Sequence, residues 1–207
     1  MLGIASPENR LIALLVAATM ALSLLGYVWR AFLRRRARAA LNASITGAGL
    51  DSLQDVLVPD GMGGTLHVDF LLLTSQGVLV VDLRDVAGNL FGGDQMTDWT
   101  VMAGARRATF PNPQGALYDR VAAVKSVAGE LPVEGRVLFT QRGRFPKGLP
   151  RWTLMVDSLR EEFPIADAQT FDALMNRYRE GWLGIRAAVT PSPLKKYPSF
   201  LTEVFFV

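Results

Sequence analysis

The chain begins with a long apolar run. Residues 11 to 29, LIALLVAATMALSLLGYVW, contain no charged side chain. A helix rises about 1.5 Å per residue, so a run of this length spans a hydrocarbon layer of about 30 Å. Tyr27 and Trp29 lie near its end, where aromatic rings favour the headgroup layer. The pattern predicts a transmembrane helix.

A cleaved signal peptide is the alternative for this segment. The apolar run is long, however, and a basic stretch, RAFLRRRARA, follows it rather than precedes it. We therefore expect an uncleaved single-pass anchor at about 11–29, within an N-terminal segment 1–41, and a domain over 42–207. Because basic residues stay on the cytoplasmic side, we expect the N-terminus outside the inner membrane and the domain in the cytoplasm. The arginines expected to bind anionic lipid headgroups are Arg30, Arg34, Arg35, Arg36 and Arg38.

After the anchor, strand-like and helix-like patterns alternate, which predicts an α/β domain. The runs rich in β-branched and aliphatic residues predict strands at 50–58, 65–74, 78–84, 98–102, 106–110, 135–140 and 152–159. VAGNLFGG, after the third run, indicates a turn and a short edge strand. Helical spacing of apolar residues predicts helices at 114–131 and 167–184, the second capped by Asp167 or Thr170.

The second and third of these runs form a hairpin with polar residues at its open end. With residues 74–77 as the loop, Asp69 lies opposite Asp82, and His67 lies opposite Arg84. Side chains alternate along a strand, so all four point to one face. The remaining positions are apolar on both faces, which is typical of a central strand pair covered on both sides.

Two carboxylates that face each other in an apolar sheet repel and lose hydration. They need a cation between them, or one of them must bind a proton. Asp69 and Asp82 offer the hard oxygen ligands that Mg²⁺ uses. The alternative is a structural cluster in which Arg84 neutralises both acids without a metal. The residue types leave both interpretations open, and His67 is either an orienter of Asp69 or an ordinary strand histidine.

The amino-acid composition excludes some kinds of metal site and limits how the domain can bind phosphates. The chain has no cysteine and one histidine, which excludes thiolate metal sites and zinc sites built on several histidines. Six of the 22 basic residues lie in residues 1–41, with one of the 19 acidic residues. Residues 42–207 therefore hold 16 basic and 18 acidic side chains. A domain with this balance binds phosphates only locally or through a cation.

The hairpin and the residues after it resemble the nuclease-related domain (NERD) family. The resemblance covers roughly residues 50 to 140: VDFLLLTSQGVLVVDLRDVAGNLFG, then Trp99, then FPNP at 110–113 and a helix. It implies a restriction-endonuclease-like mixed sheet flanked by helices. Apart from this resemblance, Trp99 is expected to be a packing residue of the core.

The resemblance also implies roles for single residues. Asp69 and Asp82 match the two metal-ligand acids, and Arg84 stands where the family has Lys. Asn112 and Pro113 match the family's Asn-Pro. The family's helix Gln falls on Ala116, with Gln114 nearby but out of register, and the family's upstream Glu has no counterpart.

Two functions follow as expectations. In the first, Mg²⁺ or Mn²⁺ on Asp69 and Asp82 supports phosphodiester cleavage of DNA or RNA. Arg84 does not give up its proton but stabilises charge on the phosphate. In the second, the site is inactive and the nuclease-like domain binds nucleic acid or a protein at the membrane. A basic loop either contacts phosphates or is merely solvated; its basic residues are Arg142, Arg144, Lys147 and Arg151.

Overall fold

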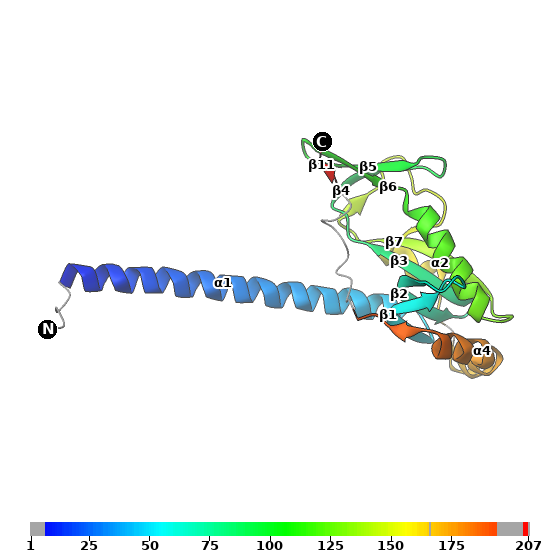
Figure 1. The fold of residues 1–207 in the computed structure, drawn as a ribbon. Coiled ribbons are helices and arrows are strands. Elements are labelled where there is room, and N and C mark those ends of the chain that lie inside the picture. Colours follow the sequence, from blue (N-terminus) through cyan, green and yellow to red (C-terminus); the bar gives the residue numbers. More distant parts are fainter. Residues whose placement is uncertain (1–6, 166, 194–204, 207) are drawn as a thin grey trace. The chain divides into compact units, whose positions relative to one another are not determined.

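The computed structural model describes residues 7–165, 167–193 and 205–206. The chain divides into two compact units, Met1–Ala43 and Ser44–Val207. Most of helix α1 (Pro7–Thr46) forms the first unit, and the second unit holds two β-sheets and the other helices (Figure 1).

α1 is one continuous helix of 40 residues. Its part from Leu14 to Thr46 is long and apolar enough to cross a membrane. The side chains of residues 14–30 are exposed on all sides of the helix, and a helix that is apolar all round leaves a large surface that water does not favour. The basic stretch after the apolar run continues the same helix. The helix is a candidate membrane span.

The first sheet has six strands in the order β10-β1-β2-β3-β7-β9. The pairs from β10 to β3 are antiparallel, whereas β3–β7 and β7–β9 are parallel, so the sheet is mixed as expected. Its strands are β1 (Asp51–Pro59), β2 (Thr65–Thr74), β3 (Gly77–Arg84), β7 (Val133–Phe139), β9 (Thr153–Met155) and β10 (Thr190–Pro191).

The second sheet has five strands in the order β11-β6-β5-β4-β8. Its β4–β8 pair is parallel and its other pairs are antiparallel. The strands are β4 (Gly88–Phe91), β5 (Asp98–Ala103), β6 (Arg106–Pro111), β8 (Gly143–Arg144) and β11 (Phe205–Phe206). Trp99 of β5 is fully buried and stacks on Phe139 of β7 with ring centroids 6.1 Å apart, so both sheets share one core, as the core role predicted for Trp99 requires.

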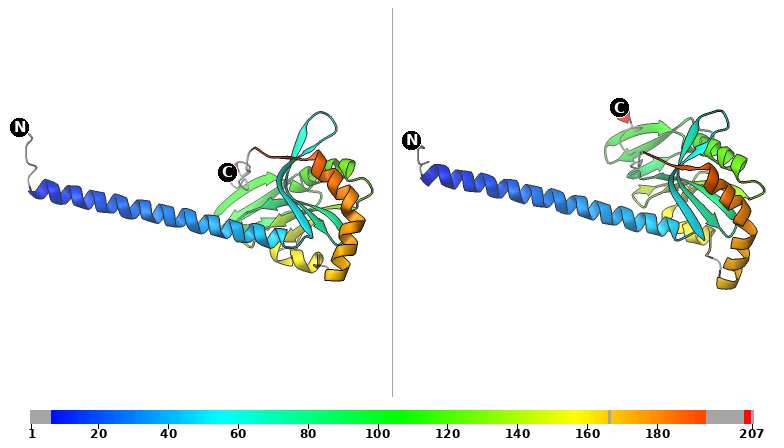
Figure 2. Two further views of the ribbon diagram at one scale, coloured as in Figure 1. Left: turned by 90° about the horizontal axis from the view of Figure 1, so that it is seen from below. Right: turned by 60° about the horizontal axis from the view of Figure 1, so that its bottom comes forward.

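Two longer helices pack on the first sheet. α2 (Pro113–Val127) crosses β7, β3, β1 and β2 and also contacts α4 (Ala168–Ala188). Figure 2 shows α4, in orange, beside the cyan strands, where Trp182 Nε1–H donates to Asp51 Oδ2 at 2.8 Å. The Asp167 side chain caps α4 by accepting from Thr170 N–H, which confirms the predicted cap.

The β2–β3 hairpin has the predicted register. Leu73 pairs with Val78, and the ladder runs from the turn to the Phe70–Val81 pair. Gly77 lies at φ 124°, and a Cβ there would stand 2.4 Å from the Pro132 carbonyl oxygen, so the turn requires glycine. All residues of β3 except Arg84 are buried, as expected for a strand pair covered on both faces.

Residues 152–159 differ from the single strand that the sequence predicts. Only Thr153–Met155 is extended, and the chain then turns into a 3₁₀ helix (Val156–Ser158) and a short α-helix, α3 (Leu159–Glu162). Asp and Ser favour helix starts over strand interiors, which explains the early end of the strand.

Candidate active site

The predicted site residues gather where the β2–β3 ladder ends. Beyond the Phe70–Val81 pair, the Asp69 side chain reaches across to β3, and its Oδ2 accepts a hydrogen bond from Leu83 N–H at 2.8 Å. Asp69 therefore lies next to the segment of β3 that carries Asp82.

Asp82 is held by two arginines. Asp82 is only 4% exposed. Its Oδ2 accepts a hydrogen bond from Arg84 Nη2 at 2.9 Å and another from Arg120 Nη1 at 3.2 Å. A buried carboxylate needs this compensation, because burial removes its hydration. Arg84 is thus placed on Asp82, one of the two acids that the structural alternative has it neutralise.

Arg120 was not singled out from the sequence. It lies on α2, and its Nε–H donates to the His67 carbonyl oxygen at 2.6 Å while Nη1 reaches Asp82. One guanidinium therefore connects α2, β2 and β3. Arg120 lies one helical turn after Ala116, the position of the family's Gln, so both residues are on the same face of α2.

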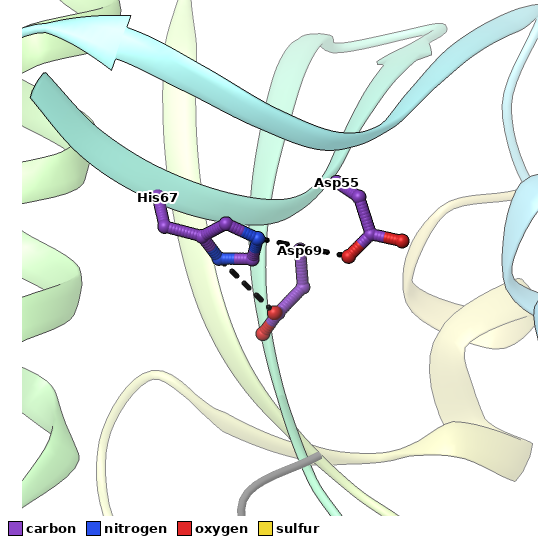
Figure 3. A group of neighbouring side chains, drawn as sticks. All are labelled: Asp55, His67 and Asp69. Carbon is purple, nitrogen blue, oxygen red and sulfur yellow. Dashed lines mark ion pairs between the residues drawn. The ribbon is translucent and has the colours of Figure 1, made fainter. Parts of the chain in front are cut away.

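A second group of polar side chains lies on β1 and β2. Figure 3 shows His67 between two carboxylates, with Nε2 at 3.6 Å from Asp55 Oδ1 and Nδ1 at 3.5 Å from Asp69 Oδ1. Their ligand atoms all lie within 4.8 Å of one another. Asp55 was also missed in the sequence, although the β1–β2 pairing places it across from Asp69, between the Gln54–Phe70 and Val56–Val68 pairs.

The residues that are present fit a divalent cation. Carboxylate oxygens suit Mg²⁺ and Mn²⁺, and an imidazole nitrogen suits the transition metals. Asp69 belongs to both groups: it neighbours Asp82 through Leu83 N–H, and it neighbours His67 directly. In the part of the chain that the structure describes, the geometry favours Asp55, His67 and Asp69 as a three-ligand group, and Asp82 lies outside it.

The Asn-Pro and the glutamine near it form a structural network. Asn112 Oδ1 accepts from Gln114 N–H at 3.0 Å and so caps α2, and Asn112 Nδ2 donates to the Met96 carbonyl at 2.9 Å. Gln114 is buried and its Nε2 donates to Asp94 Oδ1 at 3.0 Å. This bond, with a second from Arg151 N–H, lowers the pKa of the exposed Asp94 carboxyl. Gln114 therefore fastens the start of α2 to a loop.

The basic loop is partly engaged within the fold. Arg142 Nη1 pairs with Asp85 Oδ2 at 2.9 Å. The Arg151 guanidinium lies 4.7 Å from the Trp152 ring centroid, and Lys147 Nζ lies 6.0 Å from that of Phe91. These contacts orient the side chains at the surface, where contact with phosphates remains a prediction.

Comparison with known proteins gives one family. The model of the nuclease-related domain matches residues 31–140, slightly more than half of the chain. An uncharacterized protein of Bacillus anthracis is 26% identical over 73 residues, which are 35% of this chain and 34% of that protein. The chain thus aligns with about a third of that relative's length. No solved structure gives a significant match.

Proposed function

The chain belongs to the nuclease-related domain family, and on that premise we propose that it is a divalent-metal-dependent phosphodiesterase that cleaves nucleic acid. The observation that carries the proposal is the 2.8 Å hydrogen bond from Leu83 N–H to Asp69. It holds one acid beside the strand segment that bears Asp82 and Arg84, the two other residues that correspond to the family's site.

The proposed ligands of Mg²⁺ or Mn²⁺ are the carboxylates of Asp69 and Asp82. When bound, such an ion polarises a phosphate oxygen and makes a bound water more acidic. Arg84 remains charged at every working pH and stabilises the charge that develops on the phosphate oxygens.

The two arginines on Asp82 suggest how the substrate engages the site. A guanidinium binds phosphate as well as carboxylate. A phosphate that accepts hydrogen bonds from Arg84 and Arg120 therefore competes with Asp82 Oδ2, which accepts from both. Exchange of these partners would leave Asp82 Oδ2 available as a ligand of the ion.

A cleavage assay on the full chain in detergent micelles tests the function. Plasmid DNA, single-stranded DNA and RNA are each incubated with Mg²⁺, with Mn²⁺ and with a chelator. We expect cleavage of at least one substrate with an ion and none with the chelator. Asp82→Asn should lower the rate about 100-fold or more, since even residues that only support a metal ligand are worth about 10- to 100-fold.

Asp119→Asn is the matched control. Asp119 is exposed on α2, directly before Arg120, so its loss changes the same net charge without touching the site. If the folded wild-type protein cleaves none of the substrates with either ion, the catalytic proposal is wrong.

One observation favours a second candidate function, a non-catalytic module that binds nucleic acid or a protein. Asp82 Oδ2 receives both Arg84 and Arg120, so the acid is neutralised without a metal. In this case no cleavage is detected, and Asp82→Asn lowers the melting temperature because two half-buried cations lose their partner. Binding of nucleic acid or of the partner persists.

We further propose that α1 anchors the protein in the inner membrane with the N-terminus outside and the second unit in the cytoplasm. The support is the apolar helix Leu14–Thr46 and the basic cluster on its C-terminal part. The proposed contacts with anionic lipid headgroups are made by Arg30, Arg34, Arg35, Arg36 and Arg38.

A further inference from the structure

We propose that Asp55, His67 and Asp69 form a site for a divalent transition-metal ion such as Mn²⁺ or Zn²⁺. The proposal concerns binding, and it holds whether or not the protein cleaves nucleic acid. The site shares Asp69 with the proposed catalytic position but is defined by Asp55 and His67, which that position does not use.

The spacing of the three side chains carries the proposal. The His67 nitrogens lie 3.5 Å from Asp69 Oδ1 and 3.6 Å from Asp55 Oδ1. These distances exceed an ordinary N–H···O hydrogen bond of about 2.9 Å. Ligands about 2.1 Å from one ion lie about 3.0 to 3.4 Å from each other. The two contacts use different nitrogens of the ring, and an ion binds only one of them. One ligand atom from each of the three residues lies within 4.8 Å of the others, so the three side chains are near enough to share one ion.

The strand geometry explains why the three meet. Asp55 lies across from Asp69 in the β1–β2 pair, and His67 lies two residues before Asp69, so all three project from one face (Figure 3). Asp55 itself has a φ of 49°, and its carbonyl oxygen accepts from Ser192 N–H at 2.7 Å. This left-handed backbone costs about 1 kcal/mol for most residues and is easiest for Gly, Asn and Asp.

The charges point the same way. Two carboxylates on one face repel each other unless a cation lies between them. His67 is paired with Asp55 at 3.6 Å and with Asp69 at 3.5 Å. A neutral imidazole has a single N–H and cannot donate to both acids. An ion bound to one imidazole nitrogen would take one oxygen from each carboxylate and so offset their repulsion.

The site is open enough for an ion and its waters. The side chains of His67, Asp69 and Asp55 are 13%, 21% and 35% exposed, respectively, whereas that of Asp82 is 5% exposed. Three protein ligands leave positions for water or a phosphate oxygen. The imidazole nitrogen selects for transition metals over Mg²⁺.

Titration of the metal-stripped full chain in micelles with Mn²⁺, followed by electron paramagnetic resonance, tests the site. We expect binding that Zn²⁺ displaces and Mg²⁺ displaces poorly, with nitrogen coupling from the imidazole. His67→Gln should abolish the nitrogen coupling. His67→Gln and Asp55→Asn should each weaken binding at least about tenfold, because even residues that only support a metal ligand are worth that much.

Variants at position 55 separate a ligand from a structural role. Asn and Gly both tolerate the backbone of Asp55, so Asp55→Asn and Asp55→Gly should melt at or above the wild-type temperature while binding Mn²⁺ poorly. Asp119→Asn should bind normally. Wild-type affinity in the folded Asp55 and His67 variants, or absence of nitrogen coupling in the wild type, would falsify the site.

Asp82→Asn distinguishes this proposal from the catalytic one. We expect the variant to lose cleavage and to keep Mn²⁺ binding with nitrogen coupling. Mn²⁺ binding in a protein that cleaves nothing contradicts the catalytic proposal alone. Binding that is lost with Asp82→Asn and kept with Asp55→Asn contradicts the present one.

Discussion

At the scale of single residues, Arg120 connects the parts of the site. From helix α2 it donates to the His67 carbonyl, 53 residues earlier in the chain, and to Asp82 Oδ2, 38 residues earlier. Because Asp82 is almost fully buried, each of its two cations offsets part of the cost of burying its charge.

We predict that Arg120→Gln lowers the free energy of unfolding by about 1–3 kcal/mol, the usual cost of leaving a buried polar group poorly satisfied. Urea denaturation measures the change. Arg179→Gln, at an exposed position of α4, should stay within about 0.5 kcal/mol of the wild type. Combining Arg120→Gln with Asp82→Asn should cost less than the sum of the single changes, and strict additivity contradicts the contact.

The sequence predicts the position of a single residue where the alternation of side chains along a strand sets the face to which that residue points. The hairpin turn fixes which side of the sheet Asp69 and Asp82 face, and the register followed from the sequence. Arg120 could not be predicted, because the period of a helix indicates its apolar face but not the distant strand residue that a polar side chain meets. Asp55 was predictable in principle, since the same pairing argument applied to the β1–β2 hairpin places it across from Asp69.

At the scale of elements, the sequence predicted best those strands and helices whose hydrophobic pattern extends over many residues. The strands of the central hairpin and the helices α2 and α4 appear close to their predicted ranges, because each pattern is long and bounded by turn residues. The three residues of β9 were predicted as part of a longer strand, since Val156 and Leu159 continue an apolar pattern that serves a helix turn as well. The parallel pairs β3–β7 and β4–β8 join distant segments, and alternation along one strand does not specify such partners.

The start of α2 offers a test at this scale. Asn112→Ala removes both the cap on Gln114 N–H and the bond to the Met96 carbonyl, and we predict a loss of about 1–2 kcal/mol in the free energy of unfolding. Asn112→Asp keeps an accepting oxygen for the cap and removes the amide donor, so calorimetry should place its melting temperature between those of the wild type and Asn112→Ala. Equal melting temperatures for all three proteins contradict the capping role.

At the scale of the whole molecule, charge is distributed unevenly along the chain. Six of the 22 basic residues precede residue 42, with one of the 19 acidic residues. The matched family region begins at residue 31, inside α1, and so includes part of the basic helix. The membrane interpretation followed from the sequence because a long uncharged run requires no knowledge of tertiary contacts.

We predict that reporters fused to the C-terminus report a cytoplasmic location: a fluorescent protein is bright and a phosphatase that needs oxidation is inactive. Alanine at the five downstream arginines should invert part of the population, since basic residues near the helix end set orientation. Those arginines are Arg30, Arg34, Arg35, Arg36 and Arg38. Alanine at Arg106 and Arg107, which lie far from the helix in sequence, should leave the orientation unchanged. An active phosphatase in the wild-type fusion contradicts the topology.

The positive φ of Asp55 also makes position 55 informative when related chains are compared. Three residue types adopt this backbone readily, and they differ in chemistry: aspartate offers a charged oxygen, asparagine a weaker neutral one, and glycine none. A homologue can therefore lose the donor here by a single substitution that leaves its folding intact. Under the cation site proposed above, the residue at this one position would separate relatives that keep a ligand here from relatives that keep only the fold.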